Sequence, residues 1–324
     1  MTTTVALGGD TMLGRGVAER IAAYGPYGMF ADEIRDVFRS ADLSLVNLEC
    51  CVSDRGEPWA APGRPFHFRA PPAAADTLAD LGIDCVTLAN NHALDYGPEA
   101  LADTLGHLAR AGIRVVGAGP DVRRAREPAL FDTAGGPVAV LGITDHPADF
   151  AAGEERPGVA YANLRREIPA WLTARISHLS ADGLRVLLLA HWGPNMTIEP
   201  PRYIQVAARA LVDAGATLIA GHSAHVFHGM SGRVLYDLGD LVDDYAVDPA
   251  LRNDLGLVFH VTLTGSAISR LTACPLTLEY ARTRLATGTD HAWIRDRFIS
   301  ACAAFGTKVV EEDGRLAVAC PGPP

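Results

Sequence analysis

One repeated pattern constrains the fold of this chain more than any other feature. Short apolar runs alternate with helical stretches through the first two thirds of the sequence. Apolar runs of this length, bounded by turns, are typical of buried strands in βα units. The predicted strands are Thr4–Leu7, Leu43–Asn47, Cys85–Leu88, Arg114–Gly117, Val138–Ile143, Arg185–Leu189 and Leu218–Ala220. The alternation therefore predicts an α/β protein whose helices cover buried strands.

The stretches between the strands support this interpretation. Residues 98–111 and 201–214 each carry an apolar stripe at helical spacing, which is typical of a helix that covers a sheet. From Gly232 onward the chain becomes richer in predicted strands, with one helix near Ala292–Ala304. These later strands are Val234–Asp237, Leu257–Leu263, Leu271–Tyr280 and Leu316–Ala319. We therefore predict one domain built on two packed sheets with outer helices.

Composition excludes several classes of protein. Hydrophobic residues make up 48% of the chain, so it is too apolar to be disordered. The chain has 28 Lys and Arg residues against 38 Asp and Glu residues, and no run of basic residues. Nucleic acid is therefore not an expected partner, because cationic side chains supply most of that affinity. The acidic residues are instead candidate metal ligands.

The cysteines and the N-terminal sequence predict a cytoplasmic protein. The six cysteines form no CxxC pair and lie in apolar runs, as reduced thiols do. No basic stretch followed by a long apolar stretch opens the chain, so we predict neither a signal peptide nor a membrane span. A chain from which an export signal had been removed would show the same pattern.

Five predicted strands run directly into clusters of polar residues. The loops after buried strands are where α/β proteins place ligand sites, because the strands hold them rigidly. Three oxygen and three imidazole ligands suit Mn, Fe or Zn, and they could hold one ion, or two if a carboxylate bridges them. The predicted metal ligands are Asp10, Glu49, Asn91, His191, His222 and His225.

Each of these residues also has an ordinary structural interpretation. Asp10 could cap a helix that starts near Met12, and Glu49 could lie on the surface of a loop. Asn91 could belong to a turn, and His191 could be a hydrogen-bonded core residue. The placement of all the groups at strand ends favours the metal site.

His92 is the candidate general acid. Asp95 follows three residues later, so one helical turn would place its carboxylate beside the imidazole and fix the ring. A positioned acid of this kind contributes about 10²–10⁴ to the rate. We therefore predict catalytic roles for His92 and Asp95, with a metal-bound hydroxide as nucleophile.

Weaker signals surround these residues. Residues 9–16 have the spacing of a P-loop but lack its Lys and its Ser or Thr. Arg15 and Arg69 could clamp an anionic substrate group or could be solvated cations. Phe66–Phe68 is predicted to be a structural strand. His146 has no evident partner at a strand end.

Taken in order, the motifs resemble the CapA-type poly-γ-glutamate capsule-synthesis family, within the calcineurin-like metallophosphatase superfamily. The resemblance covers residues 5–261. The matching motifs are Gly-Asp-Thr-Met-Leu at 9–13, Asn-Leu-Glu at 47–49, Asp-Arg-Gly-Glu-Pro at 54–58, Phe-Arg-Ala-Pro-Pro at 68–72, Leu-Ala-Asn-Asn-His-Ala-Leu-Asp-Tyr-Gly at 88–97, His-Trp-Gly at 191–193, Gly-His-Ser-Ala-His-Val at 221–226 and Tyr-Asp-Leu-Gly-Asp at 236–240.

The resemblance implies a four-layer sandwich of two mixed β-sheets flanked by helices. It implies one domain over residues 1–324, with core motifs over 5–261 and a β-rich C-terminal extension over 262–324 packed on the core. The resemblance implies that Asp10 and His225 are ligands of one ion. It implies that a second ion is held by Asn91, His191 and His222, and that Glu49 bridges the two ions. His92 is similar to the catalytic acid. The groups that contact substrate or support the ligands are expected to be Arg15, Asn47, Arg69, Asn90 and Asp240.

Two motifs depart from the superfamily pattern. Its phosphatases carry Asp-x-His where this chain has Asp10, Thr11 and Met12, and a thioether is a poor ligand for a hard ion. The Met is itself similar to the CapA pattern. The last motif, which contains His222, is one residue longer than the usual His-x-His.

The expected function is that of a metal-dependent hydrolase or transferase. It would act on a phosphoester or a γ-glutamyl-type amide of an anionic substrate, in poly-γ-glutamate or related biosynthesis. One alternative is a non-catalytic binding partner in capsule polymer synthesis or export. Another is a biosynthetic enzyme that uses the same scaffold for a small molecule.

Overall fold

The larger of two sheets contains the N-terminal strand. The structure is a computed structural model that describes residues 1–60 and 65–318. The strands of this sheet are β1 (Thr2–Thr11), β2 (Leu43–Leu48), β5 (Cys85–Thr87), β6 (Arg114–Val116), β15 (Asp240–Val242), β16 (Leu255–Thr264), β17 (Ala267–Glu279), β18 (Arg282–Leu285), β19 (Val309–Glu312) and β20 (Arg315–Val318). Their order is β19-β20-β17-β16-β1-β2-β5-β6, with β15 beside β1 and β18 beside β17. The sheet is mixed, because β1, β2, β5 and β6 run parallel while β16 and β17 run antiparallel to their neighbours.

The smaller sheet is also mixed. Its strands are β8 (Ala129–Thr133), β9 (Gly136–Thr144), β11 (Arg185–His191), β12 (Ala216–His222), β13 (Met230–Ser231) and β14 (Val234–Leu235), in the order β13-β14-β12-β11-β9-β8. The four inner strands are parallel, and β8 and β13 pair antiparallel at the edges. Two short ladders pair β3 (Cys51–Val52) with β4 (Arg69–Ala70), and β7 (Ala118–Gly119) with β10 (Gly158–Val159).

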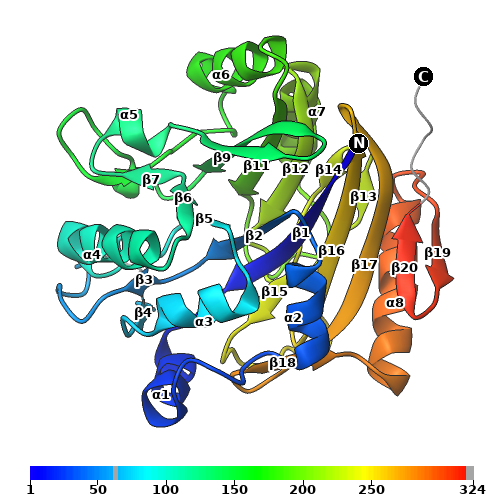
Figure 1. Cartoon of the computed structure of the whole chain (residues 1–324), viewed down its shortest axis with the longest axis horizontal. Coiled ribbons are helices and arrows are strands. Elements are labelled where there is room, and N and C mark those ends of the chain that lie inside the picture. The colour runs from blue at the N-terminus through cyan, green and yellow to red at the C-terminus, as the bar shows by residue number, and fades with distance from the viewer. Residues whose placement is uncertain (61–64, 319–324) are drawn as a thin grey trace.

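Helices cover the outer faces of both sheets (Figure 1). The helices are α1 (Arg15–Tyr24), α2 (Asp32–Arg39), α3 (Ala74–Leu81), α4 (Gly97–Arg110), α5 (Val122–Ala125), α6 (Ala170–Ala181), α7 (Arg202–Asp213) and α8 (Gly288–Ala303), with a 3₁₀ turn at Ala148–Phe150. Helices α1 to α4 share one hydrophobic core with the larger sheet, and α6 and α7 share another with the smaller sheet. Helix α8 packs against β16, β17, β13 and β19.

The alternation of side chains along the strands produces these layers. In β1, Val5 and Leu7 join the core between the sheets, while Ala6 faces the helices. In β11, Leu187 joins that central core and Leu188 faces α6 and α7. Both faces of each sheet are therefore buried, which is why the strands are continuous apolar runs. The predicted four-layer architecture of helices and two mixed sheets is confirmed.

Three further predictions concern the C-terminal strands, the cysteines and membrane-spanning helices. The strands after residue 262 belong to the same sheet as β1, and the proposed boundary between core and extension stays a prediction. Five cysteines are free and buried in the described part of the chain, and Cys320 lies outside it. None of the described helices combines the length and apolar character needed to cross a membrane.

Arg185 connects the two sheets at the end opposite the predicted site. The side chain is buried at the start of β11 and donates to Thr3 Oγ1 at 2.7 Å, to Thr133 Oγ1 at 3.1 Å and to the Gly136 carbonyl. Arg185→Met is expected to lower the free energy of unfolding by roughly 2–4 kcal/mol, since a hydrogen bond to a charged group contributes about 1.5–3 kcal/mol. Urea denaturation measures this change. An unchanged midpoint would contradict the structural role.

Candidate metal centre

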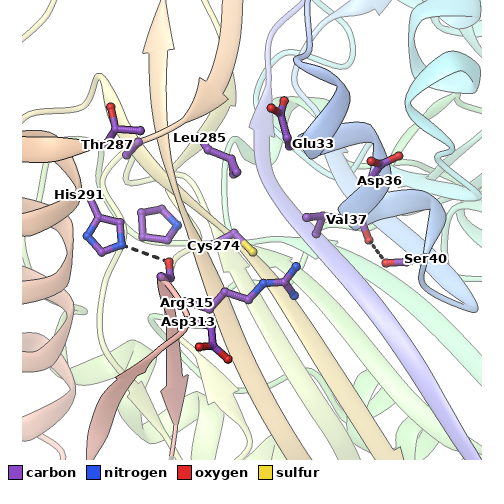
Figure 2. A pocket seen from close by; sticks show the side chains of 13 residues that line it. Glu33, Asp36, Val37, Ser40, Cys274, Leu285, Thr287, His291, Asp313 and Arg315 are labelled. Carbon is purple, nitrogen blue, oxygen red and sulfur yellow. Dashed lines mark hydrogen bonds between the residues drawn. The ribbon is translucent and has the colours of Figure 1, made fainter.

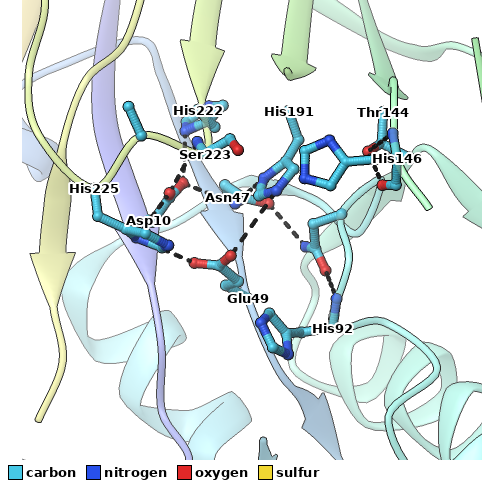
Figure 3. A network of polar contacts seen from close by, with 12 residues as sticks. Asp10, Asn47, Glu49, His92, Thr144, His146, His191, His222, Ser223 and His225 are labelled. Carbon is cyan, nitrogen blue, oxygen red and sulfur yellow. Dashed lines mark hydrogen bonds and ion pairs between the residues drawn. The ribbon is translucent and has the colours of Figure 1, made fainter. Parts of the chain in front are cut away.

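The register of the strands brings the predicted ligands together. Asp10 pairs with Asn47 across β1 and β2, and His191 pairs with His222 across β11 and β12. The ends of both sheets face the same site, so side chains from the larger sheet meet those from the smaller one (Figure 3). Glu49 follows β2 directly, and its carboxylate lies where the ends of the two sheets meet.

A close approach of two backbones adds Asp240 to the site. Asp10 in β1 pairs with Asp240 in β15, and the Asp10 amide donates to the Gly239 carbonyl at 2.9 Å. This approach requires glycine at position 9, since a Cβ atom there would lie 1.8 Å from the same carbonyl oxygen. Gly9 therefore allows two acidic side chains to lie next to each other.

Four buried side chains form a group that could hold a metal ion. Asp10, Glu49, His225 and Asp240 each offer one ligand atom, and these atoms lie within 4.8 Å of one another. His225 Nδ1 lies 2.8 Å from Asp240 Oδ1, 3.4 Å from Asp10 Oδ2 and 3.8 Å from Glu49 Oε2. The sequence assigned Asp240 only a supporting place, whereas the structure places it beside the ligand atoms.

His191 and His222 lie against this group from the smaller sheet. His222 Nδ1 is 3.1 Å from Asp10 Oδ1, and His191 Nε2 is 3.9 Å from Glu49 Oε1. One oxygen of Glu49 thus faces His225 and the other faces His191 (Figure 3). This is the position that a bridging carboxylate would need.

Asn47 and Asn90 connect the strand ends through hydrogen bonds. Asn47 Nδ2 donates to Asp10 Oδ1 at 2.8 Å and lies 3.3 Å from His191 Nδ1. Asn90 Nδ2 donates to Asn47 Oδ1 at 2.9 Å and to the Leu48 carbonyl at 2.8 Å. Asn91 lies between Asn90 and His92 in the turn that follows β5. The two amides therefore hold the loops after β2 and β5 in fixed positions.

The bonding of the buried atoms fits a bound cation. Within the described residues, Glu49 Oε1 and Oε2, His191 Nε2, His222 Nε2 and Asp240 Oδ2 are buried and have no hydrogen-bond partner. A buried polar atom without a partner is costly, and a cluster of them needs an explanation such as an ion. Carboxylate oxygen and imidazole nitrogen are the donors that divalent transition metals prefer. The residues present therefore fit a divalent metal.

Electrostatics supports the same fit. Burial and the charge of Asp10 raise the pKa of Glu49 well above its usual value. Burial and the neighbouring carboxylates Asp243 and Asp10 raise the pKa of Asp240 in the same way. Burial would also raise the pKa of Asp10, but the hydrogen bond from His222 and the nearby imidazoles lower it below the usual range. A cation would relieve the repulsion among these carboxylates.

His92 and Asp95 are arranged as their spacing predicts. His92 Nδ1 lies 2.6 Å from Asp95 Oδ2, which also accepts a hydrogen bond from the Phe68 amide at 2.7 Å. Asp95 is fully buried, and His92 is only 9% exposed. The Phe68 ring packs on the imidazole with centroids 4.1 Å apart. The ring of His92 is thus held from two sides.

The two candidate arginines occupy different places. The Arg15 guanidinium forms an ion pair with Asp244 at 3.0 Å and lines a pocket beside His92 and His225. The Arg69 guanidinium packs 4.1 Å from the centre of the Tyr96 ring and donates to the carbonyls of residues 55 and 56. Arg69 does not line that pocket, and its contact with substrate stays a prediction.

The sequence interpretation missed one histidine. His146 follows β9, and its ring lies beside that of His191 with centroids 5.1 Å apart (Figure 3). Asp145 accepts a hydrogen bond from the His146 ring and another from Tyr203 at 2.9 Å. The expectation that His146 lacks a partner at a strand end was therefore wrong. An apolar run that ends in Thr-Asp-His was the same signal that identified the other strand ends.

A second correction concerns Phe66–Phe68. These residues form no strand in the structure and lie just before β4. The Phe68 amide donates to Asp95 instead of to a neighbouring strand, which explains the difference. The segment lines the pocket beside the centre, so it belongs to the surroundings of the site.

Another pocket lies elsewhere in the fold. It has a volume of about 650 Å³ and lies between α2, β17 and β20, with Glu33, Cys274 and Arg315 among its lining residues (Figure 2). The described residues that line it include none of the predicted site residues.

This chain is similar to several known proteins. A probable polyglutamine synthesis accessory protein of Mycobacterium tuberculosis is 29% identical over 364 residues, covering 97% of this chain and 94% of that protein. The PGA biosynthesis protein CapA of Bacillus subtilis is 31% identical over 242 residues, covering 73% of this chain and 62% of that protein. A hypothetical protein from Thermus thermophilus superposes with a TM-score of 0.48 at 13% identity, covering 84% of this chain and 98% of that one.

The family model described as bacterial capsule synthesis protein PGA_cap matches residues 4–245, which is more than half of the chain. The match includes every predicted metal ligand and His92. The resemblance to the CapA-type family is thus confirmed, and this chain belongs to the PGA_cap family of bacterial capsule synthesis proteins.

Proposed function

We propose that the protein is a metal-dependent hydrolase or transferase. Its substrate would carry a phosphoester or a γ-glutamyl-type amide, in the metabolism of poly-γ-glutamate or a related compound. The observation that carries the proposal is the buried cluster of carboxylates and imidazoles, several of whose atoms lack hydrogen-bond partners among the described residues. The His92 and Asp95 pair lies within the same network of strand-end loops.

The ligands divide between two halves of the cluster. Asp10, His225 and Asp240 would hold one ion, and His191 and His222 with Asn91 would hold a second, with Glu49 between them. A divalent metal bound there would supply Lewis-acid polarisation of the scissile group. Asn47 donates to Asp10 and contacts His191, so it keeps the two halves at a fixed separation.

His92 would supply the proton to the leaving group. Its Nδ1 faces Asp95, so the proton would pass from Nε2 on the other side of the ring. Asp95 is buried and accepts two hydrogen bonds, which fixes its own orientation and that of the imidazole. The Phe68 ring packs against the imidazole and restricts the access of water to it.

Met12 favours a second candidate function. Its sulfur accepts a hydrogen bond from the Gly14 amide at 3.0 Å, and the side chain is fully buried. The first motif therefore offers no second ligand where related phosphatases have histidine. This difference supports either a single ion or a non-catalytic partner that binds polymer during capsule synthesis or export.

Metal content and turnover test the proposal together. Protein purified without chelator is expected to contain one or two equivalents of Mn, Fe or Zn by elemental analysis. It should hydrolyse either p-nitrophenyl phosphate or γ-glutamyl-p-nitroanilide, and chelation should abolish the reaction until metal is added again.

The control for this experiment is the double variant Asn91→Ala, His191→Ala, which should contain less metal and show no turnover. A parent protein that is free of metal, takes up none and hydrolyses neither compound would overturn the proposal. The non-catalytic function would then be the better one.

A further inference from the structure

A pocket of about 350 Å³ opens beside the candidate metal centre. Its lining includes His92 and His225 together with the aromatic residues Phe66, Phe68 and Tyr245. Small-molecule pockets span about 300–1,000 Å³, so this one has room for a single compact group beside the reacting atoms.

The walls of this pocket are continuous with the site. Phe68 stacks on Phe66 with centroids 6.4 Å apart, on His92 at 4.1 Å and against Tyr245 at 5.8 Å. The Tyr245 ring meets His225 edge-on at 5.2 Å. A flat group in the pocket would therefore contact rings on several sides and have its neighbouring bond next to His92.

The charges that line the pocket argue against a polyanion. Arg15 is the one permanent cation among its described lining residues, and Asp244 neutralises it through contacts of 3.0 and 3.1 Å. The Arg15 guanidinium lies 5.6–5.8 Å from the centres of the three aromatic rings, so it is part of the wall. A chain of γ-linked glutamates carries one carboxylate per residue and would need uncompensated cations here.

The Tyr245 hydroxyl is not exposed in this pocket. It is buried and has no hydrogen-bond partner among the described residues. Buried Tyr hydroxyls ordinarily have a partner. Burial and the carboxylates Glu49 and Asp240 raise the pKa of Tyr245, so the hydroxyl lies towards the candidate metal centre and only the ring lines the pocket.

We propose that this pocket binds an aromatic ring of the substrate, placed beside the bond that is cleaved or transferred. The inference rests on the proposed function for the identity of that bond, while the binding of the ring depends only on the pocket. The substrate is then a small molecule with an aryl group, rather than a run of γ-glutamyl residues.

Ligand binding tests the pocket without any turnover. Chelator-treated protein is titrated with 4-fluorobenzamide and followed by ¹⁹F NMR, with 2-fluoroacetamide as the ring-free comparison. We expect 4-fluorobenzamide alone to bind, with or without added Mn²⁺, and γ-L-glutamyl-L-glutamate not to displace it. Phe66→Ala should weaken the binding about two- to twelvefold, because one aromatic pair contributes about 0.5–1.5 kcal/mol.

Two further variants complete the experiment. Phe68→Leu keeps an apolar side chain at a buried position and should also weaken binding, while Tyr24→Ala removes an exposed ring outside the pocket and should change nothing. Equal affinity in the parent, Phe66→Ala and Phe68→Leu, or displacement by γ-L-glutamyl-L-glutamate, would overturn the inference. Ring binding by a protein without metal-dependent turnover would overturn only the proposed function, and turnover without ring binding would overturn only the pocket.

Discussion

Glu49→Gln is expected to abolish metal binding and, at the same time, to stabilise the metal-depleted protein. Burial and the charge of Asp10 raise the pKa of Glu49 in the folded state well above the ordinary value of 4.5. A carboxyl group whose pKa is raised by folding keeps its proton longer than it does in the unfolded chain. Folding stability therefore falls as the pH rises above 4.5 towards the folded-state pKa. Glutamine carries no such proton, so the variant should lose this part of the pH dependence.

The effect of added metal should have the opposite sign. A ligand at one hundred times its Kd stabilises the folded state by about 2.7 kcal/mol, and the parent should show a gain of this size. Glu49→Gln should show none, because the carboxylate that lies between His225 and His191 is gone. Thermal unfolding at pH 5 and pH 8, with and without Mn²⁺, measures both effects.

Glu19→Gln is the matched control for this prediction, since it makes the same change on the exposed surface of α1. It should leave metal content and both stability effects as they are in the parent. A Glu49→Gln protein that binds metal like the parent would remove Glu49 from the ligands.

His92→Ala should reduce turnover by about 10²–10⁴ while the metal content stays unchanged. His92 is outside the group of four residues that could hold an ion, and its ring is held by Asp95 and Phe68. Asp95→Asn should cause a smaller loss, because the imidazole remains but is no longer oriented by a buried carboxylate. Steady-state rates and elemental analysis of the same preparations measure both quantities.

The pH dependence of the rate separates a proton donor from a structural residue. Any alkaline limb in the parent's pH profile should be missing in His92→Ala, because that variant lacks the proposed proton donor. His178→Ala, at an exposed position of α6, is the control and should behave like the parent. An unchanged rate and pH profile in His92→Ala would take His92 out of the mechanism.

The sequence predicted much of the fold because most strands are buried on both faces. Apolar runs such as Val138–Ile143 and Arg185–Leu189 lie within β9 and β11, and only their ends differ. Those ends extend to Thr144 and His191, since the ladder hydrogen bonds continue into the polar residues. The sequence shows where an apolar run ends. The end of the strand itself depends on hydrogen bonding to the neighbouring strand, which the sequence does not show.

The site residues at the ends of strands could be predicted from the sequence. The site residues brought together by contacts between distant loops could not. Asp10, Glu49, His191 and His222 could be found because each stands at or next to the end of a run. The nearness of Asp240 depends on Gly9 and Gly239, whose backbones meet across more than 200 residues of sequence. No local pattern shows such a contact. Phe66 and Tyr245 meet in the pocket for the same reason, from segments far apart along the chain.

The candidate metal centre lies between the two sheets, and this position affects how the sheets are held together. At one end of the sandwich the chain supplies its own link, through Arg185 and the hydroxyls of Thr3 and Thr133. At the other end, carboxylates of the larger sheet meet imidazoles from the smaller one, and several of these buried atoms have no hydrogen-bond partner among the described residues. A shared ion would join those two halves. The concentration of the free ion would then govern how readily that end of the sandwich opens. The opposite end, which Arg185 links, would stay closed at any ion concentration.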